Sequence, residues 1–317
     1  MRRATETRAA PGVAQWNCSN RTWYRTSIGD PCRYHARMRA ISLLLFLVCL
    51  PVLAEDRVTT DFADVEAAAG ELFKKHGAKN VLIVLDIDNT LLTMNQDLGG
   101  DAWFNWQAAL LKSEPKSPQL VAKDFAGLLR VQGILFTLSG MRPPEKTTPA
   151  VVQRLQATGA SVMAMTSRGP EFRSATMRVL KENGYSFGRG APYGYPGTWM
   201  PAPADLTIKE QQKYGFIGPR RVSYMNGVFL ASGQHKGGLL RMLIHLRKLK
   251  YKAILFVDDH AKHTARVTEA WTGRKMELIT IRYARMDTQV ERFGKSDKQL
   301  VSAQWTALKA TLGSIFG

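Results

Sequence analysis

Cysteine is scarce in this sequence, and every copy lies close to the N-terminus. The chain has 317 residues and three cysteines, Cys18, Cys32 and Cys49. If the chain is cleaved after Ala54, the mature protein contains no thiol. It would then have no disulfide bond, no zinc site made of thiolates and no cysteine nucleophile.

Several other features are missing. No segment repeats at a fixed period, there is no long low-complexity tract, and no basic-aromatic motif of a nucleic-acid-binding module occurs. The apolar run at residues 41–50 is much shorter than the roughly 20 residues that cross a bilayer as a helix. These absences argue against a solenoid, a membrane span in the mature chain and a stable nucleic-acid partner. An apolar content of 45% and a charged content of 22% predict one globular body.

The apolar run has the surroundings of a secretory signal peptide. It follows Arg37 and Arg39 and leads to the small residue Ala54, so we predict a signal peptide over residues 38–54. We therefore expect a mature domain over residues 55–317, located in the periplasm or outside a bacterial cell. Residues 1–37 show no helical or strand period, and we interpret them as a mis-annotated gene start. A translated, disordered extension is the alternative.

The positive charge of the chain is only partly due to this N-terminal segment. The net charge is +18 for the whole sequence and +12 for residues 55–317, because eight basic and two acidic residues precede Glu55. A basic surface favours anionic partners such as phosphate esters, nucleotides or lipid head groups. A merely basic exported protein explains the charge equally well.

Apolar runs alternate with amphipathic segments along the rest of the chain. Buried strands are predicted at residues 81–85, 161–165 and 253–257, with a further strand at 276–281. Helices are predicted at residues 60–76, 149–158, 171–183, 236–249 and 297–312. This alternation predicts an α/β fold, a Rossmann-like doubly wound parallel sheet.

Two segments do not follow the alternation. Residues 91–146 are predicted to form a small, mostly helical cap inserted after the first motif. Residues 185–234 are rich in Gly, Pro and aromatic residues and are predicted to form an irregular insertion. Within it, Asn226-Gly227 interrupts an apolar stretch, which is a strong signal for a β-hairpin.

Polar residues follow three of the predicted strands directly: Asp86 and Asp88, Thr166-Ser167-Arg168, and Asp258-Asp259. In doubly wound sheets ligands bind outside the carboxyl ends of the strands, so these side chains are expected to meet. Asp86 could attack phosphorus and form an aspartyl-phosphate. Asp88 could protonate the leaving oxygen and then take a proton from water.

The remaining groups needed for phosphoryl transfer are also present. Carboxylates this close repel each other unless a cation lies between them, and Mg²⁺ prefers carboxylate, phosphate and water oxygens. We predict a Mg²⁺ site made of Asp86, Asp88, Asp258 and Asp259. Thr166 is the favoured phosphate-binding hydroxyl, with Ser167 as the alternative. Lys236, at a predicted helix start, supplies a cation near the phosphate.

The order of these residues resembles that of the haloacid dehalogenase-like hydrolases. Four motifs carry the resemblance, which spans roughly residues 79–285: Asp86-x-Asp88-x-Thr90, Thr166, Lys236 and Asp258-Asp259. Members with a second Asp in the first motif are typically phosphatases or phosphotransferases, and Asp88 fills that place. The resemblance thus implies a magnesium-dependent phosphoric monoester hydrolase.

Further motifs resemble a branch of exported bacterial members whose function is unknown: Leu98-Gly99-Gly100-Asp101-x-Trp103-Phe104-x-Trp106, Thr166-Ser167-Arg168, Tyr224-x-Asn226-Gly227 and Lys236-Gly237. This branch implies no particular substrate. The fourth motif has Val257 before Asp258 where Gly is commoner, so direct metal ligation by Asp259 stays open.

We therefore expect a phosphatase that acts on a small phosphorylated substrate. Trp103 and Trp106 either bind this substrate or pack within a helix. Arg168 either contacts a second anionic group on it or forms a surface salt bridge. A non-catalytic exported binding protein that retains the fold is the alternative function.

Overall fold

The computed structural model describes residues 54–192, 197–201, 206–216 and 218–316, which all belong to one compact unit. The predicted N-terminal extension and all of the predicted signal peptide except Ala54 lie outside these residues. Within the described residues, no helix is both long enough and apolar enough to cross a bilayer.

The core is an eight-stranded sheet in the order β1-β10-β9-β2-β5-β8-β7-β6. Its strands are β1 (Ala54–Thr59), β2 (Val81–Leu85), β5 (Ser161–Thr166), β6 (Gly197–Trp199), β7 (Val222–Met225), β8 (Val228–Leu230), β9 (Ala253–Asp258) and β10 (Glu277–Tyr283). All neighbouring pairs from β1 to β8 are parallel, whereas β7 pairs antiparallel with β8 and with β6. A mixed α/β fold with a mostly parallel sheet is therefore confirmed.

The strand order reverses at β2. After β2 the chain continues to β5 and β8 on one side, and it later returns to β9 and β10 on the other side. The crevice between β2 and β9 is therefore a topological switch point, where ligands bind in open α/β sheets.

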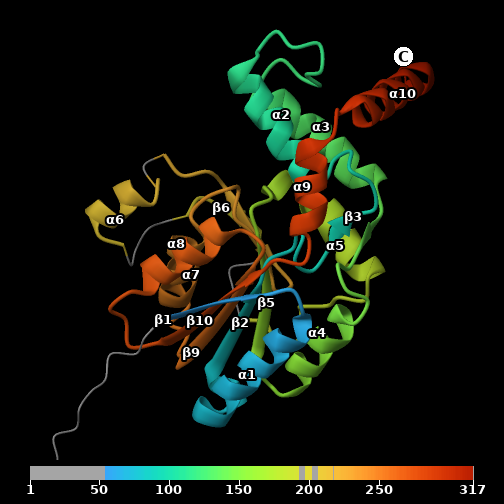
Figure 1. Cartoon of the computed structure of the whole chain (residues 1–317). Helices are drawn as coiled ribbons and strands as arrows, with labels where there is room; N and C mark the ends of the chain where they lie inside the picture. Colours follow the sequence, from blue (N-terminus) through green and yellow to red (C-terminus); the bar gives the residue numbers. More distant parts are fainter. Residues whose placement is uncertain (1–53, 193–196, 202–205, 217, 317) are drawn as a thin grey trace, which may run out of the picture. The chain divides into compact units, whose positions relative to one another are not determined.

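Helices cover both faces of the sheet (Figure 1). One face packs against α1 (Phe62–His76), α4 (Thr148–Ala157) and α5 (Arg173–Glu182), and the other against α7 (Lys236–Leu246) and α8 (Ala261–Trp271). Residues of β2 alternate between the two clusters, with Ile83 and Leu85 in the first and Leu82 and Val84 in the second. A strand that is buried on both faces needs such a continuous apolar run.

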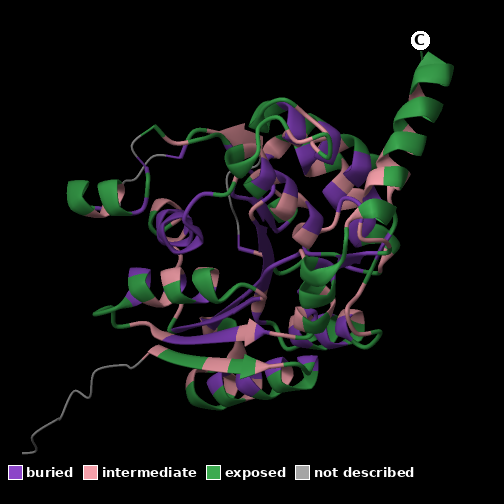
Figure 2. Cartoon of the chain, turned by 45° about the horizontal axis from the view of Figure 1, so that its top comes forward, coloured by how far each residue is buried: buried purple, intermediate pink, exposed green. Residues whose placement is uncertain are grey.

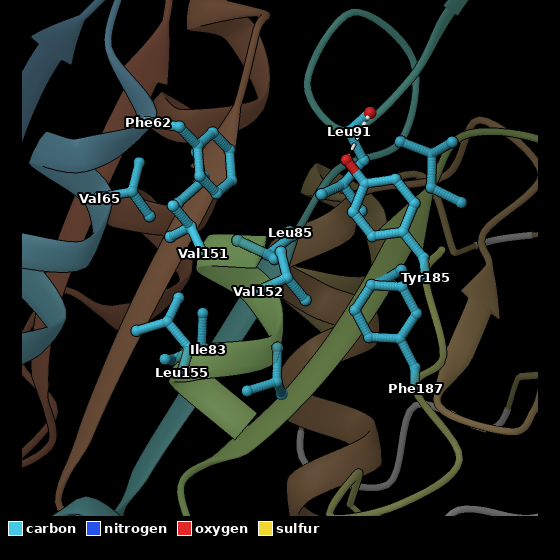
Figure 3. Close-up of a cluster of buried hydrophobic side chains, with 14 of the residues drawn as sticks. Phe62, Val65, Ile83, Leu85, Leu91, Val151, Val152, Leu155, Tyr185 and Phe187 are labelled. Carbon is cyan, nitrogen blue, oxygen red and sulfur yellow. Dashed lines mark hydrogen bonds between the residues drawn. The ribbon is translucent and has the colours of Figure 1, made fainter. Parts of the chain in front are cut away.

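The first cluster lies between α1, α4 and the sheet (Figure 3). Phe62 packs edge-on against Tyr283 with ring centroids 5.5 Å apart, and Tyr185 donates a hydrogen bond of 2.9 Å to the carbonyl of Leu91. This bond satisfies the buried phenol and ties the segment after α5 to the loop that follows β2.

Two insertions border the carboxyl ends of the strands. The first contains α2 (Asp101–Ser113) and α3 (Phe125–Leu138), and it is framed by the antiparallel pair β3 (Thr93–Met94) and β4 (Met141–Arg142). The second contains β6, α6 (Ile208–Lys213) and the β7–β8 hairpin. Gly227 in the hairpin turn has φ +74°, and a Cβ there would lie 2.5 Å from the carbonyl oxygen of Phe187, so the turn needs glycine.

The chain ends with α9 (Asp287–Lys295) and α10 (Gln299–Phe316). Most of α10 is exposed (Figure 2). Two short 3₁₀ helices, η1 (Ala78–Asn80) and η2 (Pro170–Phe172), precede β2 and α5.

Candidate functional site

Asp86 and Asp258 stand side by side at the switch point. Asp86 follows β2, and its backbone N–H donates to the carbonyl of Val257 at 2.9 Å, which continues the pairing of β2 with β9. Asp258 is the last residue of β9. Both side chains are buried, Asp86 at 4% and Asp258 at 0% exposure.

Lys236 joins these two carboxylates. Its Nζ lies 2.5 Å from Asp86 Oδ1 and 2.6 Å from Asp258 Oδ2, and its side chain is fully buried. The lysine is the first residue of α7, which approaches α8 closely: a Cβ on Gly237 would lie 2.6 Å from the carbonyl oxygen of Arg266. Because Gly237 has no side chain, the start of α7 can pack close to α8. From this position the ammonium group of Lys236 reaches both carboxylates.

Burial and repulsion act on the protonation of this group. Burial raises the pKa of Asp86 well above its usual value, and the neighbouring carboxylates add to the rise against the attraction of Lys236. For Asp258 burial acts in the same direction, but Lys236 and His263 outweigh it and lower the pKa to about 2. Lys236 keeps its charge, because the pull of both carboxylates on its pKa exceeds the opposing effect of burial.

Asp259 completes an acidic group with Asp86 and Asp258. One carboxylate oxygen from each of the three lies within 4.8 Å of the others. Asp259 Oδ2 accepts from Asn89 Nδ2 at 3.2 Å, whereas its Oδ1 is buried without a hydrogen-bond partner in the described part of the chain. Burial raises the pKa of Asp259 to about 7. An orphaned oxygen in a group of three carboxylates and one lysine fits the binding of a divalent cation.

Asp88 lies apart from this acidic group. Its Oδ1 accepts from Arg168 Nη2 at 2.7 Å and its Oδ2 from Arg168 Nε at 2.9 Å. The Thr166 hydroxyl is 3.4 Å from Asp88 Oδ2 and accepts from the backbone N–H of Arg168 at 3.2 Å. The structure thus brings three of the four predicted metal ligands together and pairs the fourth with an arginine.

Arg168 is buried, so its ion pair is not a surface salt bridge. Only 4% of its side chain is exposed, and its guanidinium carbon lies 3.9 Å from the centroid of the Phe136 ring. Its Nη1 also donates to Thr176 Oγ1 at 3.0 Å. These contacts fix the guanidinium in one orientation, with Nε and Nη2 directed at Asp88.

Two histidines and a residue of α2 surround the acidic group. His263 Nδ1 lies 3.0 Å from Asp258 Oδ1, and His260 Nε2 lies 3.3 Å from Asp101 Oδ2. The hydrogen bond with Asp101 raises the pKa of His260 to about 10. Asp101 and Asn89 were not predicted as site residues. Asn89 lies inside the Asp86-x-Asp88-x-Thr90 motif, whereas nothing in the sequence links Asp101 to His260.

A cleft of about 920 Å³ opens above these residues, and its walls include Asp86, Asp88, Thr166, Ser167 and Asp259. Lys236 and Asp258 lie beneath it, fully buried. Among the described residues the Ser167 hydroxyl has no hydrogen-bond partner, whereas the Thr166 hydroxyl is engaged by Arg168 and Asp88. The two residues therefore both remain candidates for contact with a bound anion.

Trp103 and Trp106 do not line this cleft. Trp103 is 1% exposed and packs in a cluster with Leu98 and Leu128. Trp106 packs edge-on against Phe293 of α9 with ring centroids 6.2 Å apart. Their three-residue spacing reflects helix packing, and the intervening Phe104 and Asn105 face the cleft instead.

Residues 58–315 match the family described as Protein of unknown function (DUF2608). The chain belongs to the DUF2608 family. The match covers every element that supplies the site of this DUF2608 protein, from β2 to α8. Comparison with the curated proteins finds no match.

Proposed function

We propose that this DUF2608 protein is a magnesium-dependent phosphatase that hydrolyses a phosphate monoester through an aspartyl-phosphate. The observation that carries the proposal is the buried contact of Lys236 with both Asp86 and Asp258 at the β2–β9 switch point. A structural ion pair has no need of a third carboxylate nearby, and this site adds Asp259 with an unpaired oxygen. Such an arrangement suits a divalent cation, which would offset the excess negative charge of the three carboxylates, and a phosphoryl group, which the cation and Lys236 would stabilise.

In this proposal Asp86 is the nucleophile. Its carboxylate attacks phosphorus, the bond to the leaving oxygen breaks, and the phosphoryl group remains on Asp86 until water displaces it. Lys236 favours the charged form of Asp86 and would face the phosphoryl oxygens, together with Thr166 or Ser167 from the end of β5. Asp86, Asp258 and Asp259 would hold Mg²⁺, which would neutralise part of the charge on the carboxylates and phosphate.

Asp88 would carry the proton transfers. It gives a proton to the leaving oxygen in the first step and takes one from the attacking water in the second, which restores the enzyme. In the structure both carboxylate oxygens of Asp88 are engaged by Arg168, which competes with their contact with the leaving oxygen. Esters with good leaving groups, which need little protonation, should therefore react fastest.

The proposed fold and location follow the same reading. The sheet with its switch point is consistent with a haloacid dehalogenase-like, Rossmann-like doubly wound core, and α2 and α3 with a cap over the cleft. A periplasmic or secreted location remains the prediction from residues 38–54. The proposed partner is a small phosphorylated molecule.

A non-catalytic binding protein is the second candidate, because Arg168 occupies both oxygens of Asp88. Phosphate release from a panel of generic and natural esters, with and without Mg²⁺, separates the two functions. We expect Mg²⁺-dependent release that is lost in Asp86→Asn and retained in Glu114→Gln, an exposed carboxylate outside the cleft. Thermal stability of Asp86→Asn should be nearly unchanged, since it removes one of several mutually repelling carboxylates. Release that persists in Asp86→Asn would refute the mechanism, and no release from any ester would favour the binding protein.

A further inference from the structure

The cleft above Asp86 is far larger than a phosphate group needs. Its volume of about 920 Å³ is at the upper end of the roughly 300–1,000 Å³ that small-molecule sites occupy. Its lining comes from α2 and α3 and, in the second insertion, from Thr198 of β6 with Arg220 and Arg221. Figure 1 shows α2 and α3 apart from β6. The two walls differ in chemistry, and this difference bears on the leaving group of the substrate.

The wall from α2 and α3 carries an apolar patch beside the polar residues Asn105, Lys112 and Gln132. Phe104, Ala108, Phe125 and Leu129 face the cleft, and Phe125 is 49% exposed. The rings of Phe104 and Phe125 meet edge-on with centroids 6.1 Å apart, so they form one continuous surface. Apolar side chains grouped in a cleft mark a binding surface for an apolar group more often than scattered exposed residues do.

The opposite wall is cationic. Arg220 and Arg221 precede β7, and Lys262 of α8 also lines the cleft. Among the described residues no carboxylate pairs with any of these three side chains, although all three are exposed in the cleft. Apart from Asp86, Asp88, Asp101 and Asp259, the acidic residue that lines the cleft is Glu171. The wall that contains the three cations therefore has an excess of positive charge.

We propose that the leaving group of the substrate is amphiphilic: an apolar body that packs on Phe104, Phe125 and Leu129, with a second anionic group that Arg220 and Arg221 bind. The inference rests on the proposed phosphatase activity for the position of the phosphoryl group at Asp86. The apolar body is an aromatic ring system or an alkyl chain, since both bury apolar area against phenylalanine rings. The two arginines are the reason to expect a second anionic group, because a guanidinium binds a carboxylate or phosphate through two parallel hydrogen bonds.

Four phosphate monoesters test this inference in steady-state kinetics: glycerol phosphate, phenyl phosphate, a naphthyl phosphate with a carboxylate on the distal ring, and decyl phosphate with a terminal carboxylate. We expect kcat/KM for at least one of the two carboxylate-bearing esters to exceed that for phenyl phosphate by about tenfold or more. The better of the two identifies the apolar body as aromatic or alkyl. Equal kcat/KM for all four esters would overturn the inference while leaving the phosphatase proposal intact.

Variants assign the preference to the two walls. Arg220→Gln/Arg221→Gln should remove most of the advantage in kcat/KM that the carboxylate-bearing ester has over phenyl phosphate. Phe125→Ser should lower kcat/KM for both carboxylate-bearing esters. Because Phe125 is exposed, this substitution carries little risk to folding. Lys309→Gln, an exposed cation on α10 outside the cleft, is the matched control. An advantage that survives both the arginine and the Phe125 changes would overturn the assignment.

Binding to Asp86→Asn separates this inference from the proposed function. Calorimetry should show that the better carboxylate-bearing ester binds this variant about tenfold more tightly than phenyl phosphate, and that the arginine changes remove the difference. Such binding without turnover by the wild type would support the amphiphilic ligand and refute the phosphatase. Turnover of phenyl phosphate without selective binding would do the reverse.

Discussion

Arg168 donates hydrogen bonds to both carboxylate oxygens of Asp88, with Nη2–Oδ1 at 2.7 Å and Nε–Oδ2 at 2.9 Å. The pair is asymmetric in burial, because 4% of the arginine side chain is exposed against 25% of the aspartate side chain. Loss of Asp88 would strand a buried cation, whereas loss of Arg168 would leave a carboxylate that water can reach.

This asymmetry predicts unequal stability effects. Asp88→Ala should lower the free energy of unfolding by roughly 3 kcal/mol, and Arg168→Met by roughly 1 kcal/mol, since Met retains the packing on Phe136. The double variant should lose less than the sum of the two, because neither charge is then left alone. Urea unfolding of the four proteins measures this cycle. Additive losses would contradict a coupled pair.

The same pair predicts an effect on activity under the proposed mechanism. Arg168→Lys retains the positive charge but not the two parallel hydrogen bonds, so Asp88 loses its fixed orientation. We expect kcat to fall roughly 10- to 100-fold with a smaller change in KM. Arg154→Lys is a matched control, because Arg154 binds Glu66 in the same two-bond manner on the surface. An equal loss of kcat in both variants would show that Asp88 needs no such positioning.

Much of this site could be predicted from local sequence. Polar residues end or follow the apolar run of each of the three central strands, so the pattern alone predicts that Asp86, Thr166 and Asp258 lie at the same edge of the sheet. Lys236 could be placed because it begins a helix after the last hairpin.

Side-chain partners could not be predicted in this way. Whether Asp88 turns toward Asp258 or toward Arg168 depends on packing around Phe136 and Thr176, which no spacing encodes. The edge strand β1 was missed because its exposed residues lack an apolar run. Within the predicted cap, α3 begins at Phe125, where Asp124 caps it through a 2.6 Å hydrogen bond from the Gly127 N–H.

Mg²⁺ should stabilise the folded protein if the acidic group binds it. At a concentration one hundred times its Kd, the ion would add about 2.7 kcal/mol to the free energy of unfolding, which raises Tm by roughly 5–10 °C for a protein of this size. Asp259→Asn should reduce this rise, since it removes a carboxylate whose Oδ1 is otherwise unpaired. Differential scanning fluorimetry with and without Mg²⁺ measures both shifts, with Glu114→Gln as control. A rise that is the same in Asp259→Asn would exclude that residue as a ligand.

The surroundings of His235 predict that the folded protein loses stability at mildly acidic pH. It caps α7 by accepting the Gly238 N–H at Nδ1, 3.1 Å away, and its ring stacks on Tyr214. Its Nε2 has no hydrogen-bond partner within the part of the chain that the structure describes, and Glu269 Oε2 is 3.8 Å away. Burial lowers the pKa of His235 to about 4, and the charge of Arg266 adds to this shift.

The sign of the effect follows from proton binding. Between about pH 6.5, where an unfolded histidine titrates, and pH 4, the unfolded chain holds a proton that folded His235 does not. The contribution of His235 to stability is therefore complete above pH 6.5 and falls by about 3 kcal/mol as the pH drops to 4. His235→Asn keeps a side chain that caps helices and removes the titration. Urea unfolding of both proteins from pH 7 to pH 4 should show a stability gap that moves in favour of the variant as the pH falls. A gap that stays constant with pH would mean that His235 is protonated in the folded protein, and that Glu269 then outweighs burial.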